Sequence, residues 1–446
     1  TQSETHYLFN PYHLYLSPPS YGVGFPLLLA PIYAFFGNDI YAFVIFINFA
    51  LVLFLLLHFK YLRRQFNFAE SFIITLVLAF IPKMLRLKGE VISDIPFALV
   101  ISACLLLYSK YRTSQKPATF LAIGLLAGYA MLIRSVGFLI IIAFTFDQIV
   151  LFVSAKNFGK KSLLKNSTPI ALTIISCALV YVVLGMVVYP AKQESFSFFS
   201  ELFFTNPIGD QVREGLEYYF LQLEKVFNPE ADKWQFTGIL LKSFVIVMLV
   251  LGLFNKLTKR PNFGDYFFLM YMGVIILFPV YSQGFRYLLP VLPIASGYVI
   301  TGFRSVQFER KINRNIIYFI CCISVYYAFK KEVQRIDRYY PISGLGPQTE
   351  HSKEIFQFIR KNSAEDDIIV FNKPRVLGLY AQRDSYALYP EGDLTTTKSQ
   401  LHDLGWNYIL TSTELPDPAI DEFIKMNSAE IDQVFANERF VLYRKK

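Results

Sequence analysis

The segment Lys83–Pro96 reads Lys-Met-Leu-Arg-Leu-Lys-Gly-Glu-Val-Ile-Ser-Asp-Ile-Pro, and it lies between two apolar runs that end near Ile81 and begin at Ile95. It holds three cations and two carboxylates. Each of these charges would cost about 2.5–3.5 kcal/mol at the centre of a bilayer. The segment is therefore predicted to be a loop at a membrane face. The simpler interpretation is a solvated turn, because charged loops between membrane helices are ordinary.

The composition indicates a polytopic membrane protein. Of the 446 residues, 54% are hydrophobic and 17% are charged, whereas soluble domains have about 45–50% apolar and about 25% charged residues. The net charge of +9 would also suit a nucleic-acid partner. However, the cations cluster in short loops between apolar runs, which is typical of membrane topology. The four cysteines all lie inside apolar runs and form neither a disulfide framework nor a metal-binding spacing.

The apolar runs predict about ten membrane spans. Residues 22–36 are apolar but short and contain Pro26 and Pro31, so they predict an interfacial or re-entrant helix at the end of an outer loop, residues 1–36. The expected spans are 40–59, 68–82, 95–109, 119–133, 135–153, 169–189, 237–254, 263–281, 287–303 and 315–329.

The distribution of Lys and Arg predicts the orientation of these spans. Seventeen of them lie in five short loops, 60–67, 110–118, 154–168, 255–262 and 304–314, and only five lie in the alternate short loops. The positive-inside rule places the first set in the cytoplasm. Residues 1–36, the loop 190–236 and the C-terminus are then outside, in a multi-pass protein of the plasma (inner) membrane. One further span is expected before Thr1.

From residue 330 the pattern becomes that of a soluble domain. Helices are predicted at 351–361, 374–382, 396–404 and 419–426, and strands at 367–371, 385–389, 406–411, 431–435 and 440–444. Helices that alternate with strands favour a small α/β domain with a mainly parallel sheet. The fold class is therefore an all-α polytopic membrane domain, residues 1–329, followed by an extracytoplasmic α/β domain, residues 330–446. In the loop 190–236, residues 197–204 and 214–225 look amphipathic.

The outer loops carry the candidate site residues. The segment Lys83–Pro96 contributes Lys83, Arg86, Lys88, Glu90 and Asp94, and two other outer turns contribute Arg134 and Arg286. Each arginine taken alone reads as a snorkelling or paired side chain, and Asp94 taken alone reads as an N-cap. Together they are expected to converge on one outer cavity. The charges suit an enzyme whose activated sugar arrives on a lipid phosphate: cations stabilise the departing phosphate, and a carboxylate takes the proton of the attacking hydroxyl.

At these residues the chain resembles the GT-C superfamily, which includes protein mannosyltransferases and the aminoarabinose transferases of lipid A. The similar stretches are Pro18–Gly37, Glu90 to Phe97, Gly124 to Gly137, and Arg286 to Pro293. The resemblance implies a glycosyltransferase that uses a polyprenyl-phosphate donor. It implies catalytic roles for Asp94 and Glu90, and donor-phosphate binding by Arg86, Lys88, Arg134, Arg286 and Tyr287. It also implies an acceptor path near Tyr7 and Tyr21, and a protein, lipid or glycan acceptor.

The resemblance leaves the main base and the metal open. In the superfamily the catalytic carboxylate usually stands before the Pro-Pro segment, so it is expected upstream of Thr1, with Glu4 the remaining acid in that region. No cofactor is predicted with certainty. A divalent metal would use Glu90 and Asp94, and His6 and His13 are weaker candidates.

Two alternatives belong to other classes. A transporter or flippase would show internal repeats and charges near the bilayer midplane, whereas here the charges lie at helix ends. A structural protein whose outer domain binds a partner would not depend on Arg286.

Overall fold

The computed structural model describes residues 22–37, 39–114, 116–154, 160–188, 207–227, 235–259, 261–277, 284–306, 314–339, 346–388 and 394–446. The described chain divides into two compact units, residues 22–334 and residues 335–446. The first unit is helical and the second is α/β. The domain limits and roles expected from the sequence remain predictions.

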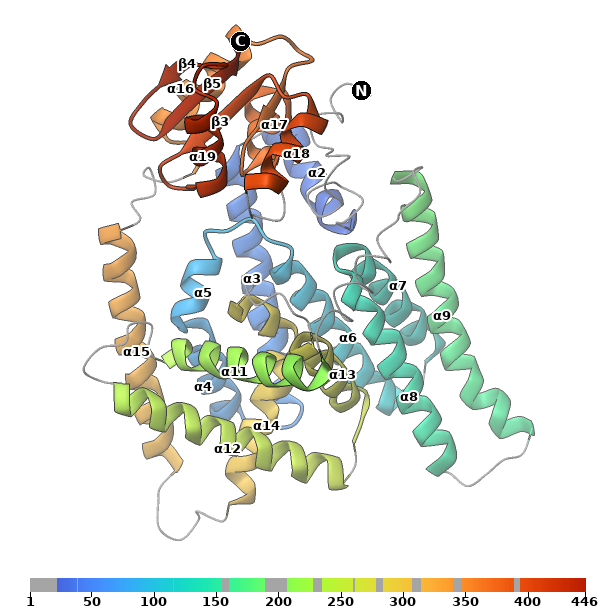
Figure 1. Ribbon diagram of the computed structural model, residues 1–446. Coiled ribbons are helices and arrows are strands. Elements are labelled where there is room, and N and C mark those ends of the chain that lie inside the picture. Colours follow the sequence, from blue (N-terminus) through green and yellow to red (C-terminus); the bar gives the residue numbers. More distant parts are fainter. Residues whose placement is uncertain are drawn as a thin grey trace. The chain divides into compact units, whose positions relative to one another are not determined.

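The helices of the first unit follow the expected apolar runs (Figure 1). They are α2 (Gly24–Phe36), α3 (Ile40–Arg63), α4 (Phe68–Ala79), α5 (Pro82–Leu87), α6 (Asp94–Ser114), α7 (Pro117–Ile133), η2 (Ser135–Phe138), α8 (Leu139–Ser154), α9 (Lys160–Val188), α11 (Ile208–Phe227), α12 (Gln235–Lys259), α13 (Phe263–Leu277), η3 (Gly284–Val291), α14 (Leu292–Ser305) and α15 (Arg314–Tyr339), the last running into the second unit.

Four helices of the described chain are long and apolar enough to cross a membrane: Ile40–Arg63, Asp94–Tyr111, Ser135–Ser154 and Ser167–Leu184. Four shorter apolar helices are Gly24–Phe36, Phe68–Ala79, Pro117–Ile133 and Phe263–Leu277. The chain is therefore an integral membrane protein. The count of about ten spans remains a prediction.

Small residues allow α7 and α9 to make a close helix contact. A side chain at Gly124 of α7 would overlap the carbonyl oxygen of Thr173 in α9, and one at Gly128 would overlap that of Cys177. Glycines spaced four apart lie on one helix face, so two helix backbones can approach each other there. The Gly-x-x-x-Gly pattern at 124–128 thus fixes the packing of α7 on α9.

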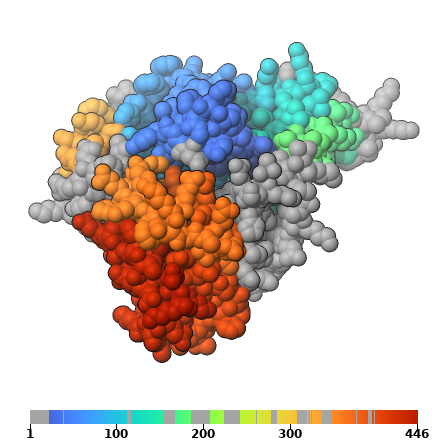
Figure 2. Space-filling view, turned by 90° about the horizontal axis from the view of Figure 1, so that it is seen from above, coloured from blue at the N-terminus to red at the C-terminus, as the bar shows by residue number. Residues whose placement is uncertain are grey.

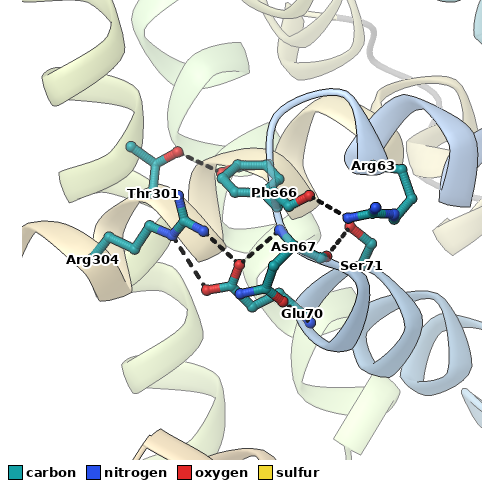
Figure 3. A network of polar contacts seen from close by, with 8 residues as sticks. Arg63, Phe66, Asn67, Glu70, Ser71, Thr301 and Arg304 are labelled. Carbon is teal, nitrogen blue, oxygen red and sulfur yellow. Dashed lines mark hydrogen bonds and ion pairs between the residues drawn. The ribbon is translucent and has the colours of Figure 1, made fainter.

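Loops expected in the cytoplasm meet one another (Figure 3). Asn67 caps α4 in a reciprocal capping box with Glu70, and Glu70 is buried. Arg304, at the end of α14, donates to both carboxylate oxygens of Glu70 at 3.2 and 2.6 Å. Its guanidinium also lies 5.1 Å from the centre of the Phe66 ring. The first and the last of the basic loops therefore lie at the same end of the bundle, as a common side requires.

The second unit is a five-stranded sheet covered on both faces, and in the space-filling view its described residues form one contiguous body (Figure 2). Its elements are α16 (Glu350–Asn362), β1 (Ile368–Val370), α17 (Pro374–Ala381), β2 (Asp384–Tyr386), α18 (Leu394–Leu404), β3 (Tyr408–Ser412), α19 (Pro418–Met426), β4 (Ile431–Ala436) and β5 (Phe440–Lys445). Successive strand residues face opposite sides. Ile369 and Leu410 pack with α16 and α17, whereas Val370 and Ile409 pack with α18 and α19.

The expectation of a mainly parallel sheet is wrong. The strand order is β2-β1-β3-β5-β4; β1 pairs in parallel with β2 and β3, but β5 pairs antiparallel with β3 and β4. The reason is local. Only residues 437–439 separate β4 from β5, and so short a connection makes a hairpin, because a parallel pair needs a crossover.

Candidate functional site

An ion cluster forms where three helix ends meet that the sequence assigns to the outer side, and we call Asp94, Arg134, Arg286 and Tyr287 the Asp94 cluster. Nη1 of Arg134 lies 2.5 Å from Oδ1 of Asp94, and Nε of Arg286 lies 4.0 Å from Oδ2. The Asp94 side chain is 5% exposed, against 20% for Arg134 and 29% for Arg286. A nearly buried carboxylate thus lies between two half-buried guanidinium groups.

Tyr287 holds the two cations together from the other side. Its ring centre lies 4.4 Å from Cζ of Arg134 and 5.8 Å from Cζ of Arg286. A guanidinium over an aromatic face is attracted by the ring quadrupole, by about 0.5–2 kcal/mol. Tyr271, buried in α13, donates its hydroxyl to the carbonyl oxygen of Tyr287 at 2.9 Å. The ring is therefore anchored through its own backbone.

Each member of the cluster comes from a helix end. Asp94 begins α6, rather than preceding it as an N-cap. Arg134 ends α7 in extended conformation, with φ −148° and ψ 131°, and its carbonyl oxygen accepts from Gly137 in η2. Arg286 and Tyr287 lie in the 3-10 helix η3 that leads into α14. Three helix ends that are far apart in the sequence thus bring their charged side chains together.

The sequence predicted that the segment Lys83–Pro96 is a loop, but part of it is helical. Its first part forms α5, because Pro82 suits the first helical position and Met84, Leu85 and Leu87 are buried. This leaves Arg86 on the opposite face, where it forms a bidentate ion pair with Glu332 of α15; Nη2 of Arg86 lies 3.1 Å from Oε2. Glu332 is fully buried. Arg86 therefore has a carboxylate partner of its own, separate from Asp94.

The other predicted residues of this segment lie around the cluster or face solvent. Partial burial raises the pKa of Glu90, and Asp94 adds to the increase, while Arg286 and two other cations oppose it. Glu90 is thus in electrostatic contact with the cluster. The side chain of Lys88 is exposed, and its carbonyl oxygen accepts from Asn48 of α3 at 2.8 Å.

Some candidates lie outside the described residues, namely Glu4, His6, Tyr7, His13 and Tyr21, and so do residues 197–204. Within the described ranges no group of three or more His, Cys, Asp or Glu side chains could hold a metal ion. Glu90 and Asp94 supply only two carboxylates, and Asp94 is already paired with Arg134. The described residues therefore bring two carboxylates together here, one of them in an ion pair, and no third ligand of these types.

Sequence reasoning missed Glu332 and two tyrosines. Glu332 lies in a stretch of α15 with mixed charges, Lys-Lys-Glu-Val-Gln-Arg, that resembles a solvated helix end. Tyr271 lies in an apolar run and reads as core. Tyr218 lies in α11, and its hydroxyl accepts from the backbone N–H of Gly284 at 2.7 Å. The amphipathic pattern at 214–225 was the only feature of the sequence that predicted α11, and it did not predict the hydrogen bond between Tyr218 and Gly284.

Known proteins share sequence and fold features with this chain. Residues 20–184 match the family described as dolichyl-phosphate-mannose-protein mannosyltransferase. The structure is similar to that of ArnT from Cupriavidus metallidurans bound to undecaprenyl phosphate, with a TM-score of 0.61 and 13% identity over 99% of this chain and 91% of that one. It is also similar to the archaeal oligosaccharyltransferase AglB from Archaeoglobus fulgidus in complex with an inhibitory peptide and a dolichol-phosphate, with a TM-score of 0.53 and 12% identity. No curated protein matches the sequence.

The extent of these similarities limits what they mean. The AglB match covers 92% of this chain but 64% of AglB, so this chain spans less than two thirds of that protein. At 12–13% identity, the similarity of ArnT and AglB to this chain is a similarity of fold. The family match covers residues 20–184, and the shared fold extends over nearly all of the chain. Both support the resemblance to the GT-C superfamily of membrane glycosyltransferases that the sequence predicted.

Proposed function

We propose that the chain transfers a monosaccharide from a polyprenyl-phosphate-linked donor to an acceptor at the extracytoplasmic face, with inversion of the anomeric centre. ArnT was solved with undecaprenyl phosphate, and AglB with a dolichol-phosphate and a peptide. These proteins support a lipid-linked donor, and the peptide bound to AglB supports a protein as one of the possible acceptors, which are a protein, a lipid or a glycan.

Arg286 carries the proposal. Its Nε is buried and donates to no atom of the described chain, and the nearest carboxylate oxygen, on Asp94, is 4.0 Å away. A buried donor without a partner costs about 1–3 kcal/mol. Two arginines share the one carboxylate of Asp94. The cluster is therefore suited to an added anion, and a lipid phosphate satisfies that requirement.

The proposed reaction is a direct displacement. The acceptor oxygen or nitrogen attacks the anomeric carbon, the bond from that carbon to the phosphate oxygen breaks, and its electron pair leaves with the polyprenyl phosphate. Arg286 and Arg134 stabilise the charge that grows on this phosphate. Asp94, committed to Arg134, holds the two guanidinium groups in place. Glu90 orients the acceptor and takes the proton that its attacking oxygen or nitrogen loses. Partial burial raises the pKa of this carboxyl.

The experiment measures release of polyprenyl phosphate from a labelled lipid-linked sugar in proteoliposomes. Arg286→Ala and Arg134→Ala are each expected to lower turnover about 10²–10³-fold, as loss of one oxyanion donor does. Arg286→Lys should recover only part of this, because an ammonium cannot make the forked contact. Arg213→Ala is the matched control, since that arginine lies on α11 with a 67% exposed side chain.

Near-normal turnover of the folded Arg286→Ala and Arg134→Ala proteins would refute the leaving-group role. Movement of the lipid-linked sugar across the bilayer without transfer would favour the transporter alternative instead.

The same proposal places the C-terminal unit outside the cell and the basic loops inside. In a background without the four native cysteines, a cysteine at Lys361, exposed in α16, should react with an impermeant maleimide on intact cells. A cysteine at Lys116, exposed before α7, should react only after permeabilisation. The reverse pattern would invert the topology.

A further inference from the structure

The turn that begins η3 is unusual in its backbone. Gly284 has φ +65°, a conformation that residues other than glycine adopt only with strain. Its backbone N–H donates to the hydroxyl of Tyr218 at 2.7 Å. Arg286 follows two residues later. The backbone that leads to Arg286 is therefore set by a glycine and fastened to another helix by one tyrosine oxygen.

A second tyrosine fastens the other side of Arg286. The hydroxyl of Tyr271 in α13 donates to the carbonyl oxygen of Tyr287 at 2.9 Å. The two tyrosine hydroxyls thus hold the backbone on either side of Arg286, one as acceptor from the N–H of Gly284 and one as donor to the carbonyl of Tyr287. Neither oxygen belongs to a charged group, so each bond fixes geometry without changing the charge of the cluster.

The helix that carries Tyr218 is itself firmly placed. A side chain at Gly215 would overlap the carbonyl oxygen of Ile276, so α11 lies in direct backbone contact with α13, and Figure 1 shows α11 lying across that helix. Gln211, Tyr219 and Gln222 are buried on the same side of α11, which matches the helical period. Tyr218 lies next to this packed face, and burial raises its pKa, so its hydroxyl is neutral at physiological pH.

We propose that Tyr218, together with Tyr271, is a positioning residue that acts on the donor phosphate only through Arg286. Tyr218 fixes the turn at Gly284, the turn fixes η3, and η3 aims the guanidinium of Arg286 at the anion beside Asp94. The inference rests on the proposed function, because it assigns a role to residues that hold the proposed phosphate ligand. It extends the site to α11, a helix outside the Asp94 cluster.

The test is a double-mutant cycle in proteoliposomes, with turnover measured as a function of donor concentration and binding measured with undecaprenyl phosphate alone. Tyr218→Phe removes one oxygen and should weaken undecaprenyl phosphate binding and lower turnover about three- to tenfold, which corresponds to one neutral hydrogen bond. In the Arg286→Ala background the same change should have no further effect, since residues that act as a unit are not additive. Gly284→Ala strains the same turn, so it should also weaken undecaprenyl phosphate binding and lower turnover, with no further effect in the Arg286→Ala background.

Tyr298→Phe is the matched control. It also removes a buried tyrosine hydroxyl, one that donates to Asp265 at 2.8 Å, and it should leave undecaprenyl phosphate binding unchanged. Tyr218 does not act through Arg286 if Tyr218→Phe leaves binding and turnover unchanged, or if it lowers them equally with Ala or Arg at position 286. Either result would refute this inference and leave the proposed function standing. If Arg286→Ala itself binds undecaprenyl phosphate normally, the proposed function fails, and the inference falls with it.

Discussion

Asp94→Asn tests whether one carboxylate holds the Asp94 cluster together. The substitution keeps the shape of the side chain and removes its charge. In the structure that charge faces Arg134 at 2.5 Å and Arg286 at 4.0 Å, and the side chain is 5% exposed. Removing one partner of a buried ion pair typically costs about 3–5 kcal/mol, because the other charge is left uncompensated.

Two features of the site reduce this cost. The Arg134 side chain is 20% exposed, so water screens part of its charge, and its guanidinium stays over the Tyr287 ring, a contact worth up to about 2 kcal/mol. The amide oxygen of the new residue can still accept one hydrogen bond. We therefore expect the free energy of unfolding to fall by about 2–3 kcal/mol. Asp210→Asn, which breaks an exposed pair with Arg213, should cost less than about 1 kcal/mol.

The assay is equilibrium unfolding in mixed micelles, combined with undecaprenyl phosphate binding. Because the variant gains one net positive charge at the cluster, it should bind undecaprenyl phosphate at least as tightly as the original protein while its turnover falls. An Asp94→Asn protein as stable as Asp210→Asn would refute the claim that the charge of Asp94 holds Arg134. Weaker undecaprenyl phosphate binding with unchanged stability would refute the charge argument.

Three further predictions concern single contacts. Because the pKa of Glu90 is raised above its ordinary value of 4.5, folding favours the protonated carboxyl, and this contribution to stability is lost as pH rises through the folded pKa. Glu90→Gln keeps a neutral side chain at every pH, so its advantage in unfolding temperature over the original protein should increase across that range. A difference that does not change with pH would contradict this prediction. Arg86→Ala should lower the free energy of unfolding by about 3–5 kcal/mol, and Glu332→Gln in the same chain should restore most of it; no restoration would mean that the pair is not the cause. Arg304→Ala should cost about 1.5–3 kcal/mol by removing the charged hydrogen bonds to Glu70, and Arg304→Lys, which lacks the fork, should restore little in the same unfolding assay.

Much of the architecture follows from local patterns. Apolar runs of span length, interrupted by Lys and Arg, predict helices whose positions the structure confirms, because each such helix must satisfy its own backbone and expose apolar side chains to lipid. The capping box of Asn67 and Glu70 is likewise local, because the two residues stand three positions apart in the sequence. The helices and strands of the second unit likewise appear in order, from periods of 3.6 and 2 residues.

The contacts of the candidate site required the tertiary structure. The sequence determined that Asp94, Arg134 and Arg286 stand at helix ends on a common side, because a charge inside a bilayer is too costly to lie elsewhere. It did not determine the pairing: Asp94 accepts from Arg134, whereas Arg86 pairs with Glu332, 246 residues away. Nor did it predict that Tyr218 would hold the turn before Arg286. Helix ends are set by local periodicity and cost of burial, but which ends meet depends on the packing of helices far apart in the chain.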